Sequence, residues 1–338
     1  MVHPPDFHAE FAPAAPPGQL PRAPLRLSCV VPAYNEQGGL AQFLQALAEH
    51  VRTLTLEFEI LVVNDGSRDA THEVALQLAQ TLPVRYLALS RNYGKEAALS
   101  AGIDHARGNV VLLIDADFQH PLELLARMHA LWLQGNDMVY GVIADRAAES
   151  RVKQLGTRLY YRLINSGNSV KLPPHAGDFR WMDRKVVDAL KALPERNRCM
   201  KGLYAWVGFK TVALPFVPGN RMSGQTSFTL RRLSALALVG LTSFTTLPLR
   251  VWSVMGFGVA LLALAYGAWI TLRTLLFGAE IAGWSTLAAG IMLFSGVQLM
   301  SIGILGEYIG RIYEEVKRRP NYLIAHDEDR SPLRDDAP

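Results

Sequence analysis

Two carboxylates follow an apolar run near the middle of the sequence. Residues 110–114 read Val-Val-Leu-Leu-Ile, and Asp115 and Asp117 come next, separated by one residue. Five consecutive apolar residues predict a buried strand, and open α/β sheets bind their ligands where such strands end. Carboxylate oxygens at this spacing suit Mg²⁺ or Mn²⁺, which would leave coordination positions for water and a substrate diphosphate. The alternative is that Asp117 caps a helix that begins at Pro121.

A repeated strand, loop and helix pattern positions these carboxylates. Strands are predicted at residues 27–31, 59–63 and 84–89, each followed by a polar loop and a helical pattern, ahead of the strand at 110–114. Four strands alternating with three helices predict a parallel sheet whose polar loops meet at its carboxyl edge. We therefore expect the four loops to form one surface.

The first two loops carry groups that could bind a nucleotide. Residues 65–67 (Asp-Gly-Ser) suit ribose hydroxyls or phosphate, although the same residues are ordinary at the start of a helix. Tyr34 and Glu36 could contact a nucleoside or could simply close the first turn. The Gly-X-Gly-X-X-Gly pattern is absent after the first strand, and residues 94–96 read Gly-Lys-Glu, so neither a dinucleotide cofactor nor a Gly-Lys-Ser/Thr phosphate loop is expected.

Two long apolar segments lie in the C-terminal third. Residues 251–272 and 281–306 contain no charged residue, and each exceeds the ~20 residues that a helix needs to cross a bilayer. Neither has a polar face, which disfavours two buried helices of a soluble protein, and the short link at 277–283 predicts a hairpin. Basic residues flank the hairpin at Arg231, Arg232, Arg250, Arg311, Lys317, Arg318 and Arg319. Arg273, near the far end of the first apolar segment, is the one basic residue that does not fit this pattern. The positive-inside rule then places both flanks, and the domain before them, in the cytoplasm.

Composition sets the expected partners and compartment. Half of the 338 residues are hydrophobic, the formal net charge is +4, and the two cysteines, Cys29 and Cys199, lack metal-binding spacing. We therefore expect a lipid bilayer as partner, no nucleic acid, and reduced thiols. The proline-rich residues 1–26 contain no secretory signal and are expected to be disordered, as are the charged residues 327–338.

Three loop motifs together resemble a known family. Residues 31–36 (Val-Pro-Ala-Tyr-Asn-Glu), 63–69 (Val-Asn-Asp-Gly-Ser-Arg-Asp) and 115–119 (Asp-Ala-Asp-Phe-Gln) look like the nucleotide-sugar-binding half of a family 2 inverting glycosyltransferase. Residues 177–184 and 195–208 narrow the resemblance to the polyprenyl-phosphate glycosyltransferases, the dolichol-phosphate mannose synthase group and its bacterial relatives that glucosylate undecaprenyl phosphate. Further matches lie at 221–228, 230–233 and 306–311, so the resemblance covers about residues 27–323.

The resemblance implies an α/β fold in which a Rossmann-like GT-A nucleotide-sugar-binding domain precedes interfacial helices and a two-helix transmembrane hairpin. It implies a protein of the cytoplasmic (inner) membrane with both termini in the cytoplasm, assembled as a homotetramer. The implied boundaries are 1–26 for the disordered tail, 27–215 for the catalytic domain, 195–248 for overlapping interfacial amphipathic helices, about 249–273 and 283–306 for the spans, and 307–338 for a cytoplasmic C-terminal helix and tail.

The implied activity is transfer of a sugar from a nucleoside-diphosphate donor, a UDP-sugar, to a polyprenyl phosphate such as undecaprenyl phosphate, for cell-envelope glycosylation. Glucose is the family-level expectation for the sugar. A Mg²⁺ or Mn²⁺ ion held at Asp117, with Asp115 and Gln119 nearby, would stabilise the charge on the leaving diphosphate. Because the acceptor is already an anion, a strong general base is less necessary than in transfer to a hydroxyl group. Asp178 is the candidate for orienting or deprotonating the phosphate; its plainer role is a loop cap or a salt bridge to Arg180.

The resemblance also assigns the remaining site residues. Those expected around the donor are Pro32, Tyr34, Glu36, Asp65, Lys95, Asp115, Arg221 and Ser223, and those expected at the acceptor phosphate are Arg180, Arg196, Arg198 and Lys201. The basic residues could instead contact anionic lipid headgroups. His120 stands where relatives usually have aspartate, and we interpret it as a turn residue.

Two other functions fit parts of the sequence. A processive polysaccharide synthase is weakened because two spans are too few for a polymer channel and the Gln-X-X-Arg-Trp motif is absent. A non-catalytic membrane adaptor that kept the fold is opposed by the intact Asp115, Asp117 and Asp178. Metal-dependent binding of a nucleotide-sugar would separate the enzyme from the adaptor.

Overall fold

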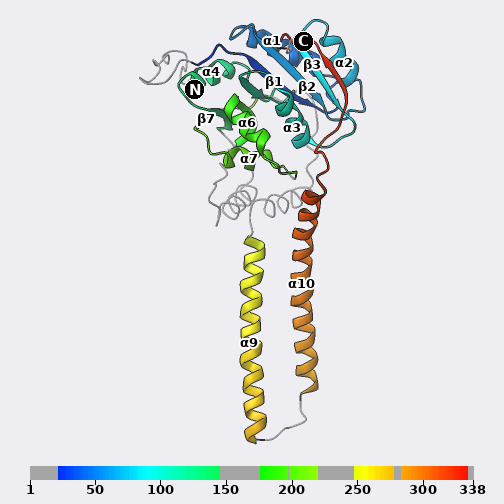
Figure 1. The fold of residues 1–338 in the computed structure, drawn as a ribbon, viewed down its shortest axis with the longest axis vertical. Coiled ribbons are helices and arrows are strands. Elements are labelled where there is room, and N and C mark those ends of the chain that lie inside the picture. Colours follow the sequence, from blue (N-terminus) through cyan, green and yellow to red (C-terminus); the bar gives the residue numbers. More distant parts are fainter. Residues whose placement is uncertain (1–21, 145–175, 197, 220–246, 278–282, 334–338) are drawn as a thin grey trace, which may run out of the picture. The chain divides into compact units, whose positions relative to one another are not determined.

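The computed structural model describes residues 22–144, 176–196, 198–219, 247–277 and 283–333. The chain divides into two compact units, which are described separately (Figure 1). One unit contains a β-sheet and is built from residues 1–154, 172–227 and 320–338. The other contains two long helices and is built from residues 155–171 and 228–319. The C-terminal residues therefore belong to the sheet unit, although the helical unit separates them from it in sequence.

The described strands form one eight-stranded sheet, with the order β7-β5-β6-β4-β1-β2-β3-β8. Its centre is the part that the apolar runs predict. The central strands are β4 (Val110–Leu113), β1 (Leu27–Ala33), β2 (Phe58–Asn64) and β3 (Val84–Leu89), and each runs parallel to its neighbour. The predicted strand and helix repeat is thus confirmed.

Flanking strands that the sequence pattern did not predict make the sheet mixed. β6 (Ala176–Asp183) runs antiparallel to β4 and to β5 (Met138–Ile143), and β8 (Ile324–Asp329) runs antiparallel to β3. β7 (Thr211–Phe216) runs parallel to β5. A helical crossover makes consecutive strands parallel, but β4 and β6, or β3 and β8, are not consecutive in the chain.

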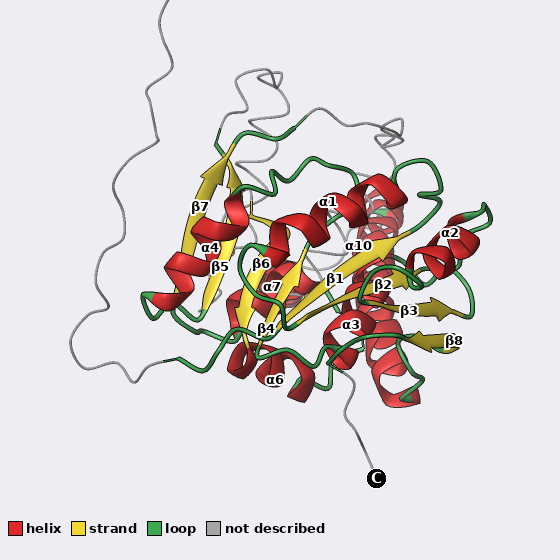
Figure 2. Cartoon of the chain, turned by 90° about the horizontal axis from the view of Figure 1, so that it is seen from above, coloured by secondary structure: helices red, strands yellow, loops and turns green. Residues whose placement is uncertain are grey.

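Helices cover both faces of the sheet (Figure 2). The helices on one face are α1 (Leu40–Arg52), α2 (Thr71–Leu78) and α4 (Leu124–Leu133), and those on the other are α3 (Lys95–His105), α6 (Arg184–Ala192) and α7 (Met200–Trp206). Alternate residues of β1 enter the two cores, with Val31 on the α1 side and Val30 on the α3 side. A Cβ on Gly102 would lie 2.1 Å from Cγ1 of Val30, so glycine allows α3 to approach the sheet closely.

The region expected to form interfacial helices, 195–248, contains helix α7 and strand β7, so the expectation of a helix is wrong at residues 211–216; residues 220–246 lie outside the described residues. The Met200, Leu203 and Tyr204 side chains of α7 are buried in the core that α3 and α6 share, whereas Trp206 is exposed. Most of the apolar side chains of α7 therefore complete the protein core rather than a membrane-facing surface.

The helical unit contains both predicted apolar segments, in α9 (Leu247–Phe277) and α10 (Trp284–Lys317). Large apolar side chains are exposed along both helices, including Phe257, Leu262 and Leu299, each with about 70% of its surface exposed. Among the residues that the structure describes, one stretch, Leu293–Lys317, is long and apolar enough to cross a membrane.

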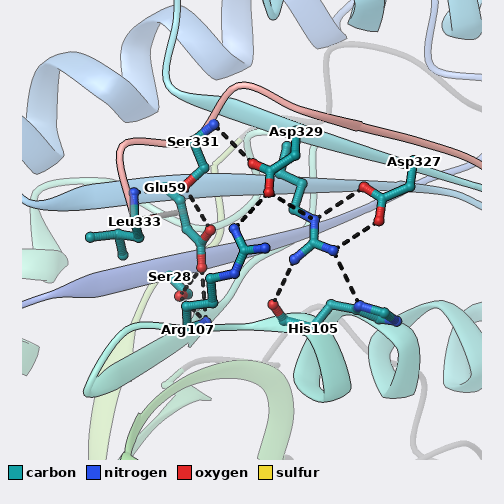
Figure 3. Close-up of polar contacts among 9 residues, drawn as sticks. Ser28, Glu59, His105, Arg107, Asp327, Asp329, Ser331 and Leu333 are labelled. Atoms are coloured by element: carbon teal, nitrogen blue, oxygen red, sulfur yellow. Dashed lines mark hydrogen bonds and ion pairs between the residues drawn. The ribbon is translucent and has the colours of Figure 1, made fainter. Parts of the chain in front are cut away.

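The C-terminal residues return to the sheet as β8, where arginines hold them (Figure 3). Arg85 of β3 donates hydrogen bonds to both carboxylate oxygens of Asp327, at 3.1 and 2.8 Å, and Arg107 donates to Asp329 at 2.7 Å. The expectation that residues 327–338 are disordered is therefore wrong as far as Leu333. The charges that suggested disorder are paired with arginines more than 200 positions earlier in the chain.

A buried glutamate anchors the same segment. Glu59 of β2 is fully buried, and its Oε1 accepts hydrogen bonds from the Ser28 hydroxyl at 2.5 Å and from the backbone N–H of Arg107 at 2.9 Å. Its Oε2 accepts a hydrogen bond from the hydroxyl of Ser331 at 2.8 Å. We call Ser28, Glu59, Arg107 and Ser331 the Glu59 cluster. It lies at the amino ends of β1 and β2, so it supports the sheet from the edge opposite the polar loops.

Candidate active site

The turn after β4 holds the two carboxylates in a constrained backbone. Phe118, the residue after Asp117, has φ of 56°, a left-handed conformation that is unusual for a bulky side chain. Its ring packs edge-on against Phe43 of α1, with centroids 5.2 Å apart. The backbone N–H of Gln119 donates to Asp117 Oδ1 at 3.1 Å. The capping alternative for Asp117 is wrong, because α4 begins only at Leu124 and Glu123 precedes it.

Lys95 joins Asp115 to Asp178, a carboxylate from another strand. The ammonium of Lys95, the first residue of α3, lies 2.7 and 2.8 Å from the two carboxylate oxygens of Asp115 and 3.1 Å from Asp178 Oδ2. Burial opposes ionisation of Asp178, but the positive charges of Lys95, Lys201 and Arg180 outweigh it and hold the pKa of Asp178 below its usual range. The structure thus brings together three residues that the sequence separates widely, and keeps Asp178 ionised at neutral pH.

Asp65 positions the loop that carries Lys95. Its two carboxylate oxygens accept hydrogen bonds from the backbone N–H groups of Tyr93 at 2.7 Å and Gly94 at 2.8 Å, and the side chain is nearly buried. Gly94 has φ of 96°, which glycine adopts without strain. Burial raises the pKa of Asp65, although both N–H groups favour its charged form. Both oxygens of this predicted ribose ligand are thus already engaged by the backbone.

The first and second loops are joined into one surface, as predicted. The backbone N–H of Asn35 donates to the hydroxyl of Ser67 at 3.0 Å, and the Asn35 side chain accepts from the N–H of Arg68 at 2.9 Å. The N–H of Glu36 donates to the Thr71 hydroxyl at 2.9 Å. Of the residues expected around the donor, Pro32 is half-buried near the end of β1, and Tyr34, two residues later, is exposed.

Arg180, expected at the acceptor phosphate, is almost fully buried. Its guanidinium lies over the rings of Tyr204, at 4.1 Å, and Tyr140, at 5.0 Å, and its Nε donates to the carbonyl of Gly177 at 3.1 Å. The Tyr204 hydroxyl and Asp178 Oδ1 are both buried without a hydrogen-bond partner in the described part of the chain. Sequence reasoning missed both tyrosines, because nothing in their local pattern distinguishes them from core residues.

The other residues expected at the acceptor differ in exposure. Arg198 donates to the carbonyls of Leu193 and Glu195, at 2.9 and 3.2 Å, so its guanidinium organises the loop before α7. Arg196 is half-buried in that loop, and Lys201 is exposed on α7. Arg221 and Ser223 lie outside the described residues.

His120 fills the turn between Asp117 and α4, as interpreted from the sequence. Its ring stacks on Phe179 of β6, with centroids 4.7 Å apart. Burial lowers the pKa of His120, although Asp115 and Asp117 favour its charged form. Its Nδ1 has no hydrogen-bond partner among the described residues.

The turn that carries Asp115 and Asp117 could bind a divalent cation only together with other ligands. Among the described residues, no group of three or more histidine, cysteine, aspartate or glutamate side chains is arranged to hold a metal by itself. Mg²⁺ is commonly bound by one or two carboxylates together with substrate phosphates, and Asp115 and Asp117 supply such a pair. The donor set therefore suits a cation that arrives with a phosphorylated substrate.

The layered sheet and the acidic loops at its carboxyl edge define an α/β enzyme of the Rossmann-like class. Residues 28–191 match the family described as Glycosyl transferase family 2, and residues 247–312 match the GtrB C-terminal hairpin. The chain belongs to glycosyltransferase family 2, and its sheet unit is a GT-A-like domain with a mixed sheet. The resemblance inferred from the motifs is thereby confirmed.

Relatives match almost the whole chain. A glycosyltransferase from Synechocystis, described as uncharacterized, is 45% identical over 89% of this chain and 95% of its own. The bactoprenol glucosyl transferase of Shigella phage SfII is 44% identical over 89% of this chain and 97% of its own. Among solved structures, glucosyl-3-phosphoglycerate synthase from Mycobacterium tuberculosis, with Mn²⁺, uridine diphosphate and phosphoglyceric acid, is 20% identical over 63% of this chain and 75% of its own, with a TM-score of 0.45.

Proposed function

We propose that this glycosyltransferase moves glucose from UDP-glucose to a polyprenyl phosphate of the bactoprenol (undecaprenyl) type, giving a lipid-linked sugar for cell-envelope glycosylation. The observation that carries the proposal is the site of Asp115, Asp117, Asp178 and Lys95, in a chain that matches bactoprenol glucosyl transferases over 89% of its length. Such relatives support the acceptor and the sugar, and the acidic turn supports a diphosphate donor.

In this proposal the polar loops bind the donor. Asp115, Asp117 and Gln119 would hold Mg²⁺ or Mn²⁺, which when bound supplies Lewis-acid stabilisation of the leaving diphosphate. The joined first and second loops, with Pro32, Tyr34 and Glu36, would face the base and ribose, and Asp65 would act by fixing the loop of Lys95. Arg221 and Ser223 are proposed to close over the diphosphate.

An acceptor oxygen of the lipid phosphate would attack the anomeric carbon as the bond from that carbon to the diphosphate oxygen breaks, which inverts the configuration. The acceptor needs no strong base because it is an anion, and the lowered pKa of Asp178 suits a group that orients the acceptor better than one that takes its proton. Arg196, Arg198 and Lys201 are proposed to attract the lipid phosphate. The burial of Arg180 suits a supporting role beside Asp178.

We further propose that α9 and α10 form a two-span hairpin in the inner membrane, with the sheet unit and both termini in the cytoplasm. Their exposed apolar side chains support this, because soluble surfaces rarely present such large apolar areas. The proposed spans are about 249–273 and 283–306, with the catalytic domain at 27–215 and a cytoplasmic segment at 307–338. Assembly as a homotetramer is part of the same proposal.

The test is transfer of radiolabelled sugar from UDP-glucose, UDP-galactose or GDP-mannose to undecaprenyl phosphate by the detergent-solubilised protein with Mg²⁺ or Mn²⁺. We expect labelling from UDP-glucose, and its loss in Asp117→Asn. Asp188→Asn, which changes an exposed carboxylate paired with Arg184, is the matched control and should keep full activity. If only another donor labels the lipid, the assignment of glucose is refuted. If the protein is folded but neither labels the lipid nor binds a nucleotide, the proposed function is refuted.

A further inference from the structure

The ammonium group of Lys95 is a positive charge within the acidic site itself. It contacts both oxygens of Asp115, at 2.7 and 2.8 Å, and Asp178 Oδ2 at 3.1 Å. The two carboxylates come from the end of β4 and from β6, so their charges would repel each other without a cation between them. Lys95 therefore neutralises Asp115, the same carboxylate that is proposed to face the divalent cation.

The backbone of Lys95 is anchored, whereas its side chain is long and partly exposed. Asp65 binds the N–H groups of Tyr93 and Gly94 directly before it, and α3 begins at Lys95 itself. Beyond this anchor, the side chain is 45% exposed and carries its charge on a flexible four-carbon stem. The ammonium can therefore exchange partners without any movement of the helix.

A divalent cation at Asp115 would compete with this ammonium. Both are attracted by the same carboxylate oxygens, and two cations in contact with one carboxylate repel each other. Because the lysine stem is flexible, movement of the ammonium away from Asp115 would relieve this competition.

We propose that Lys95 is a displaceable counter-cation, which binds Asp115 and Asp178 in the metal-free site and moves from Asp115 to the donor diphosphate when the divalent cation and the nucleotide-sugar bind. This inference rests on the proposed function and deepens it. Asp178 remains a partner of the ammonium throughout, so the acceptor-orienting carboxylate and the leaving diphosphate share one cation. No covalent bond changes in this exchange.

The experiment measures Mn²⁺ affinity by electron paramagnetic resonance, with purified full-length protein in detergent and without nucleotide. In Lys95→Met the competing ammonium is gone, and we expect Mn²⁺ to bind about tenfold more tightly than in the wild type. Lys95→Arg keeps the charge and should remain within about threefold of the wild type. The matched control is Lys201→Met, because Lys201 acts on Asp178 from a distance and should change Mn²⁺ affinity by less than about twofold.

The same variants should respond in the opposite direction to the donor. With Mn²⁺ saturating, UDP-glucose should bind Lys95→Met about tenfold more weakly than the wild type, because the diphosphate loses a charge-assisted partner. Lys95→Gln gives a second neutral variant, and circular dichroism identifies any variant that fails to fold. The two opposed shifts distinguish displacement from a merely structural role, which would weaken both ligands together.

Two results separate the inference from the function on which it rests. If the wild type transfers glucose with Mn²⁺ but the neutral variants bind Mn²⁺ no more tightly than it does, the counter-cation role is overturned and the proposed function stands. If the wild type neither binds Mn²⁺ in the presence of UDP-glucose nor transfers glucose, the proposed function fails and this inference fails with it.

Discussion

Removing one hydroxyl from the Glu59 cluster should release the C-terminal strand. Ser331 donates to Glu59 Oε2 at 2.8 Å and accepts a hydrogen bond from the backbone N–H of Leu333 at 3.0 Å. Ser331→Ala abolishes both bonds and leaves an oxygen of a fully buried carboxylate without this donor. Hydrogen bonds to charged groups contribute about 1.5–3 kcal/mol, so we expect β8 to lose about 2 kcal/mol against local opening.

Hydrogen exchange measures this directly. A loss of about 2 kcal/mol corresponds to about 30-fold faster exchange wherever β8 opens before the rest of the domain. The peptides to compare cover β3 and β8, since these two strands pair with each other. Peptides from β1 and β4, in the middle of the sheet, should change far less.

A control variant in the same strand tests the reasoning. Glu328 makes an exposed ion pair with Arg330, so Glu328→Gln should accelerate exchange in β8 by less than about fivefold. If Ser331→Ala leaves the exchange of β8 within about threefold of the wild type, or if Glu328→Gln accelerates it equally, the buried cluster does not hold this strand.

Three further predictions concern Asp327, Gly102 and Asp178. The hydrogen bonds from Arg85 outweigh burial and hold the pKa of Asp327 below its usual range. The stabilisation of β8 by Asp327 should therefore be complete above about pH 4, the pKa of an aspartate in the unfolded chain, and should be lost as the pH falls through the lower pKa of the folded state. Hydrogen exchange corrected for intrinsic rates would show this loss. Constant protection of β8 down to pH 2 would contradict this. Gly102→Ala should lower the free energy of unfolding, measured in urea, by about 1–3 kcal/mol, because the new methyl group overlaps Val30. Adding Val30→Ala to the same chain should recover part of that loss. Equal losses with and without Val30→Ala would exclude the overlap. Asp178→Asn should lower kcat for glucose transfer about 100-fold with KM for UDP-glucose changed less than about threefold, and a KM effect alone would place Asp178 at the donor instead.

The central strands and the acidic turn were predictable because their signals are local. Apolar runs such as residues 110–114 can be satisfied only by burial, and the strand and helix alternation then sets a parallel centre with its loops at one edge. The joining of the Asn35 and Ser67 loops follows from that topology alone. Likewise, the apolar segments of α9 and α10 can be recognised from their composition alone, without knowledge of the residues that they contact.

Contacts between distant segments had no such signal. The charges of Asp327 and Asp329 suggested a loose end, and only the fold shows that Arg85 and Arg107 stand opposite them. Only the structure shows that the oxygens of Asp65 accept hydrogen bonds from the backbone before Lys95, while its contact with ribose stays a prediction.

The sequence by itself thus determined the kind of chemistry, because the properties of carboxylates, glycines and apolar runs can be read from a few neighbouring residues. The tertiary structure alone decided which carboxylates share Lys95, that Arg180 is buried between tyrosines, and that the chain closes its sheet after the helical unit. These features depend on pairing across tens to hundreds of residues, and such pairing is set by the packing of the whole domain rather than by any single stretch of it.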